Sequence, residues 1–143
     1  MSESETQKTV GIDGLIEFGQ YLTTLGYCLE CHTQDDRGKL RADRKFAGGR
    51  EFDSPIGRVI SANISPDRAT GIGNWTEDMF VQRFKAYQRS GDHPPPKATA
   101  ANFTVMPWLS FSQMNEPDLQ AIFKYLRTQL PVVNTVMAHP TAQ

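Results

Sequence analysis

Apolar residues recur at helical spacing in three separate stretches of the chain. The first stretch predicts a helix from about Asp13 to Leu25, and Gly26 suits the C-terminal cap of such a helix. Its apolar positions are Leu15, Phe18, Leu22 and Leu25. Gly19 lies on the same face, where the missing side chain would let another helix approach closely.

Two further helices are predicted in the second half of the chain. Thr76 is a good N-cap for one of them, with Trp75 and Phe80 at the spacing of a hydrophobic staple. The last helix begins after Asn115 and ends before Pro131. Its predicted buried face consists of Leu119, Ile122, Phe123 and Leu126.

The stretches 33–74 and 92–114 carry no sustained apolar period, and glycine and proline interrupt both. Neither shows the alternation of a convincing strand, so the pattern predicts no sheet. Such a long loop is unusual in a compact domain unless it wraps a large cofactor that supplies part of the core. The sequence therefore predicts an all-α fold of about three main helices, with long loops wrapped around a bound group.

Length and composition are those of one small domain. The chain has 143 residues, 38% of them hydrophobic, and its 15 basic and 16 acidic residues give a formal charge of −1. That balance does not favour nucleic acid, and no apolar run approaches the ~20 residues that span a bilayer. We expect a flexible N-terminal tail over 1–11, one domain over 12–133 and a C-terminal tail over 134–143.

The strongest chemical signal in the chain is Cys28-Leu29-Glu30-Cys31-His32. These two cysteines are the only ones present, and C-x-x-C-H is typical of covalent haem attachment. Three residues apart, the sulfurs lie on one side of a helical turn, where each can add to one vinyl group of the same porphyrin. His32 can then bind the iron as the proximal ligand. The motif predicts one covalent haem c.

Two other interpretations of this motif fit less well. A zinc site needs four ligands, and the motif supplies three of them. The fourth ligand would have to be His93 or His139. A thioredoxin-type redox pair would need a βαβ unit around it, and the pattern predicts none. A haem-free metal or thiol protein is therefore the third hypothesis for the chain.

The sixth position of the iron also has a candidate ligand. Met106 lies in an irregular segment, and Pro107 restricts its backbone, so a thioether there is held stiffly enough for a weak axial bond. Met114 and His93 are the chief alternatives. A His/Met pair raises the reduction potential and leaves no open position for substrate, which suits electron transfer rather than oxygen or peroxide chemistry.

From about Gly19 to Pro131, the chain resembles a class I, cytochrome c-like domain. It is similar to the haem domains in the cytochrome subunits of bacterial membrane-bound alcohol, aldehyde and gluconate dehydrogenases. The blocks that carry the resemblance are Gly19-Gln20-Tyr21-Leu22, Cys28 to Thr33, Phe46-Ala47-Gly48-Gly49, Ser61 to Asp67, Thr70 to Thr76, Met106-Pro107-Trp108 and Asp118 to Pro131.

The resemblance implies a cytochrome c-like fold, thioether links at Cys28 and Cys31, and His32 and Met106 as the proximal and distal iron ligands. It also implies that the first and last helices cross near the haem edge. Export to the periplasm is implied as well, with the leader peptide not present in this chain. The resemblance also allows two alternative roles for Pro55, Arg58, Asn63 and Trp75. Each could contact the haem or its propionates, or could serve only in loop and core packing.

The dehydrogenase subunits that the chain resembles carry three such haem motifs and a C-terminal membrane-binding segment, whereas this chain has one motif and a short end after Met137. We therefore expect an electron carrier rather than an enzyme, either free-standing or one domain of a larger protein. It would pass single electrons from a dehydrogenase-type donor to a respiratory acceptor, such as an oxidase or another cytochrome. The alternative is a haem-based ligand-binding or sensory domain with a displaceable sixth ligand.

Overall fold

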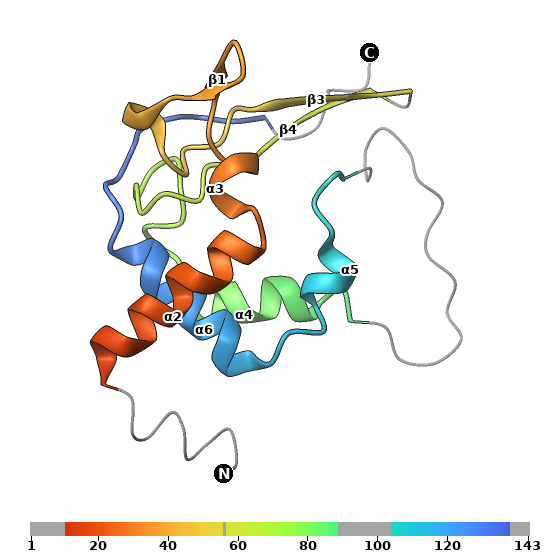
Figure 1. Cartoon of the computed structure of the whole chain (residues 1–143). Helices are drawn as coiled ribbons and strands as arrows, with labels where there is room; N and C mark the ends of the chain where they lie inside the picture. Colours follow the sequence, from red (N-terminus) through yellow and green to blue (C-terminus); the bar gives the residue numbers. More distant parts are fainter. Residues whose placement is uncertain (1–10, 56, 89–103, 138–143) are drawn as a thin grey trace.

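The structure is a computed structural model that describes residues 11–55, 57–88 and 104–137 (Figure 1). Residues 1–10 of the expected N-terminal tail and residues 138–143 of the expected C-terminal tail lie outside this range. So do His93 and His139, which the sequence offers as further ligands for a metal.

Three longer helices form the frame of the domain, and each lies where the apolar spacing predicts a helix. They are α2 (Ile12–Leu25), α4 (Glu77–Lys85) and α6 (Glu116–Arg127). The shorter elements are the single-turn helices α3 (Cys28–Cys31) and α5 (Trp108–Phe111) and a 3-10 helix over Ala42–Arg44. None of the described helices has the length and apolarity needed to cross a bilayer.

Helices α2 and α6 lie directly against each other (Figure 1). A Cβ atom at position 19 would lie 2.0 Å from the carbonyl oxygen of Ala121 and 2.9 Å from the Cβ of Tyr125, so only glycine permits this approach. The close helix contact predicted from Gly19 is therefore confirmed.

Helix α4 joins α6 through an aromatic core. Thr76 caps α4 as predicted, because its hydroxyl oxygen accepts a hydrogen bond from the backbone N–H of Met79 at 3.1 Å. The ring centroids of Phe80 and Phe84 are 5.0 Å apart, and Phe80 lies 5.3 Å from Phe123 of α6. All three rings are buried, so this contact fixes how the two helices pack.

The prediction of an all-α fold is wrong, because two small antiparallel sheets lie between residues 35 and 60. Their strands are β1 (Asp35–Asp36) with β2 (Lys39–Leu40), and β3 (Glu51–Ser54) with β4 (Gly57–Ile60). The first hairpin turns through Arg37 and Gly38, which both have positive φ (54° and 87°). Strands of two and four residues are too short to show a clear alternation, so this stretch resembles loop in the sequence.

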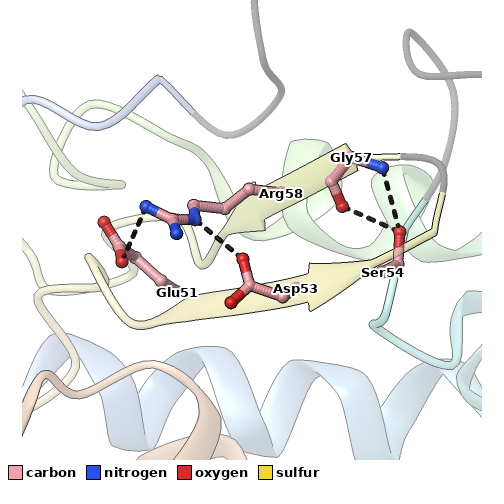
Figure 2. Close-up of polar contacts among 5 residues, drawn as sticks. All are labelled: Glu51, Asp53, Ser54, Gly57 and Arg58. Atoms are coloured by element: carbon pink, nitrogen blue, oxygen red, sulfur yellow. Dashed lines mark hydrogen bonds and ion pairs between the residues drawn. The ribbon is translucent and has the colours of Figure 1, made fainter.

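Charged side chains meet on the exposed face of the second hairpin (Figure 2). The Nε of Arg58 donates to Asp53 Oδ1 at 2.8 Å, and its Nη1 lies 3.2 Å from Glu51 Oε2. At the turn, Ser54 Oγ donates to the carbonyl of Gly57 at 2.7 Å. Since all three charged side chains are at least half exposed, each ion pair contributes only ~0–1 kcal/mol. The Arg58 guanidinium is thus held by its own hairpin.

Candidate functional site

The Cys28–His32 motif forms a single helical turn directly after α2. Tyr27 enters the left-handed region, at a φ of 58°, and turns the chain out of α2. The backbone N–H of His32 then donates to the carbonyl of Cys28 at 2.9 Å, which closes the turn. Cys28 and Cys31 are free thiols, and both are partly exposed. Three residues apart on one turn, they can reach two neighbouring points on one side of a flat ligand.

The surroundings of Cys28 disfavour the thiolate form of its side chain. Burial raises its pKa to about 12, and the neighbouring Cys31 and Glu30 add to the shift. At neutral pH and without a bound metal it is therefore a protonated thiol, unlike the low-pKa thiols of disulfide-exchanging proteins. Within the described residues, no group of three or more His, Cys, Asp or Glu side chains could hold a metal ion. The raised pKa of Cys28 weighs against the thioredoxin-type interpretation. The zinc interpretation depends on His93 or His139 as the fourth ligand, and both lie outside the described residues.

His32 is buried and fixed in orientation. Its Nδ1 lies 2.7 Å from the carbonyl oxygen of Ala62, and burial lowers the pKa of the imidazole. The ring is therefore neutral and donates from Nδ1–H, which leaves the lone pair on Nε2 free. A backbone carbonyl that orients the second ring nitrogen is the usual arrangement for a metal-ligating histidine. His32 thus fits the role of proximal ligand to a haem iron.

Backbone hydrogen bonds place Ala62 opposite the His32 ring. Gly48 N–H donates to the carbonyl of His32 at 2.7 Å, and Gly49 N–H donates to the carbonyl of Ser61 at 2.8 Å. The two glycines therefore bridge the loop that carries His32 and the loop that carries Ala62. The sequence gives no signal for Ala62, because its contribution is a backbone carbonyl and not a side chain.

Asn63 anchors the loop that carries Ala62. Its side chain is buried, and its amide nitrogen donates to three oxygens between 2.9 and 3.2 Å away. These acceptors are Thr70 Oγ1 and the carbonyls of Val132 and Asn134. The chain after α6 is thereby tied to the loop beside His32. Asn63 thus has a packing role, and a contact of its side chain with the haem or its propionates stays a prediction.

Met106 lies at the edge of the apolar core, just before α5. It is partly buried and packs against the core, as Cys28 does, and its carbonyl accepts from the N–H of Trp108 at 2.8 Å. Met114 packs against the same core. Both methionines are therefore candidates for the sixth ligand, whereas His93 lies outside the described residues.

A cavity of about 150 Å³ lies between α2, α3 and α6, and Leu29 and Glu30 of the cysteine motif are among the residues that line it. Polar side chains line much of it, among them Gln20, Thr23, Glu30 and Lys45. Ligands of drug size occupy pockets of ~300–1,000 Å³, so this cavity is too small for a porphyrin.

No family model matches the chain, but several bacterial proteins are similar to it. The gluconate 2-dehydrogenase cytochrome c subunit of Pantoea cypripedii is 32% identical over 113 residues, which cover 79% of this chain and 23% of that protein. The cytochrome c subunit of the quinone alcohol dehydrogenase of Gluconacetobacter polyoxogenes is 35% identical over 111 residues (78% and 21%). A subunit of the nicotinate dehydrogenase of Pseudomonas putida is 34% identical over 119 residues (82% and 9%).

The chain spans less than a quarter of the length of these relatives, so it corresponds to one segment of each. More than three quarters of this chain lies within the similar region in every case. The chain therefore belongs to the c-type cytochrome domains, the family that includes the cytochrome c subunits of bacterial gluconate and alcohol dehydrogenases.

Proposed function

We propose that the chain is a monohaem cytochrome c domain that transfers single electrons, with His32 and Met106 as the axial ligands of the iron. The arrangement around His32 supports this most directly. A buried, neutral imidazole has its Nδ1 held at 2.7 Å by Ala62, directly after two free thiols on one helical turn. When bound through Cys28 and Cys31, haem c supplies the couple between Fe(III) and Fe(II).

The residues of the chain supply attachment, orientation and exclusion of water. The two thioethers keep the porphyrin in place in both oxidation states, and the Ala62 carbonyl fixes the plane of the imidazole. Met106 would supply the thioether that occupies the sixth coordination position, so that no site for substrate would be left at the iron. A protein that binds its iron in this way is an electron carrier rather than an enzyme.

The relatives suggest what the domain works with. Two of them are named as cytochrome c subunits of dehydrogenases, so we propose a dehydrogenase-type electron donor and a respiratory acceptor for this chain. We place the haem-binding domain at residues 12–133 and the protein in the periplasm, where covalent attachment of haem c takes place.

The absorption spectrum of the purified, haem-loaded protein tests this function. We expect a low-spin ferric spectrum with a sulfur-to-iron charge-transfer band, and a ferrous form that does not bind carbon monoxide at low concentration, because both axial positions are filled. A high-spin ferric spectrum with tight binding of carbon monoxide would contradict the proposal and favour the ligand-binding or sensory alternative.

A further inference from the structure

The segment that carries Met106 cannot hold its own conformation. Helix α5 has four residues, and a single isolated turn of helix is unstable in water because nucleation of a helix is costly. The position of Met106 therefore depends on contacts that residues 104–114 make with the rest of the domain. In the described residues, the C-terminal half of α4 supplies several of these contacts.

The first contact is made by Lys85, the last residue of α4. Its Nζ donates to the carbonyl of Ser112 at 3.0 Å and to the carbonyl of Met114 at 2.5 Å. Ser112 is the C-terminal cap of α5, and its N–H bonds to the carbonyl of Trp108. The partly buried ammonium group thus binds the carbonyls just after α5, where a helix end lacks internal partners.

The second contact holds the other end of α5. The ring of Trp108 stacks on Tyr87 with centroids 4.7 Å apart and an angle of 9° between the planes. The guanidinium of Arg83 lies over the same Trp108 ring at 5.1 Å. Because the N–H of Trp108 also bonds to the carbonyl of Met106 at 2.8 Å, this stack fixes the backbone next to the proposed ligand.

We propose that Lys85 is a positioning residue that keeps Met106 on the haem iron, with the stack of Arg83, Trp108 and Tyr87 as its second support. The inference rests on the proposed function, in which Met106 is the sixth ligand. A thioether bond to iron is weak, so the fraction of molecules with Met106 detached depends on how firmly the segment is held. An external ligand binds only this detached fraction, and its apparent affinity reports the fraction directly.

The experiment titrates the ferric, haem-loaded protein with imidazole and follows the loss of the sulfur-to-iron band. Lys85→Met keeps the length and apolar stem of the side chain but removes all donors, and we expect it to raise the apparent imidazole affinity about tenfold. Lys85→Arg keeps donors for both carbonyls and should stay close to the wild type.

Lys124→Met is the matched control. It makes the same substitution on α6, where the Lys124 ammonium pairs with the carboxylate of Glu77 at the start of α4 and not with the segment that carries Met106. This variant is expected to lose some resistance to urea while it keeps the wild-type imidazole affinity. General loosening of the fold is thereby separated from release of Met106.

Arg83→Gln covers the case in which Lys85→Met does not fold. Arg83 is exposed, and loss of its cation–π contact should raise the imidazole affinity about threefold. Imidazole affinities of Lys85→Met and Arg83→Gln equal to that of Lys124→Met would overturn the positioning role alone. A sulfur-to-iron band that survives in Met106→Ala would overturn the ligand assignment, and with it both proposals.

Discussion

Replacing Gly48 with alanine is expected to lower the free energy of unfolding of the haem-loaded protein by about 3 kcal/mol. Gly48 has a φ of 69°, where an L-residue costs ~1–2 kcal/mol. A Cβ atom there would also lie 2.4 Å from the carbonyl carbon and oxygen of Ala62, and overpacking of this kind costs ~1–3 kcal/mol. Urea unfolding followed by circular dichroism measures the change.

Gly38→Ala separates the two causes of this loss. Gly38 also has a positive φ, of 87°, but a Cβ atom at this position would meet nothing within 4 Å. Its substitution should cost only the ~1–2 kcal/mol of backbone strain. An equal loss of stability in both variants would contradict the close contact between Gly48 and Ala62. It would then also contradict the position of the Ala62 carbonyl, which accepts the hydrogen bond from His32.

Met106→Ala is expected to abolish the sulfur-to-iron charge-transfer band and to lower the reduction potential. The fall should be on the order of 0.1 V, a fraction of the roughly 0.8 V that axial ligands span in haem proteins. The thioether favours Fe(II), so a water or other oxygen or nitrogen ligand in its place shifts the balance toward Fe(III). Spectra recorded at controlled potentials measure both effects in one titration.

Met114→Ala is the matched control for this ligand assignment. Met114 is partly buried against the same core as Met106, so its removal should cost stability through lost packing. We expect its charge-transfer band and its potential to stay those of the wild type. The reverse pattern, with the band lost in Met114→Ala and kept in Met106→Ala, would assign the sixth position to Met114.

The helices could be predicted from the sequence, and haem attachment could be proposed from it, because both signals are local. Four apolar side chains at helical spacing predict α2, and the threonine cap predicts the start of α4. All residues of the motif Cys28-x-x-Cys31-His32 lie within five positions. Gly19 also predicted a tertiary contact, because a glycine on the apolar face of a helix lets another helix approach closely.

The two hairpins were missed because their strands are short and their pairing depends on turns. Arg37 reaches a positive φ that is unusual for its residue type, and no sequence pattern signals it. In the second hairpin, Pro55 and Gly57 interrupt the run Phe52 to Ile60 and make it resemble a loop. The sequence therefore favoured an irregular wrap where the structure has paired strands.

The residues that we propose as supports of the site could not be predicted, because they act over long distances in sequence or through the backbone. Ala62 contributes a carbonyl oxygen 30 residues away from His32. Lys85 reaches the carbonyl of Ser112 across 27 residues, and a lysine at the end of a helix is usually explained by the helix dipole and solvent. Only the folded arrangement shows what these groups hold.

Covalent attachment of one haem is the central claim, and mass spectrometry of the intact, denatured protein tests it most directly. After expression with a haem-maturation system, the account predicts a polypeptide heavier by the mass of one haem, and no covalent haem in the double variant Cys28→Ala/Cys31→Ala. Protein that stays at the mass of the bare polypeptide, or that carries more than one haem, would contradict the account.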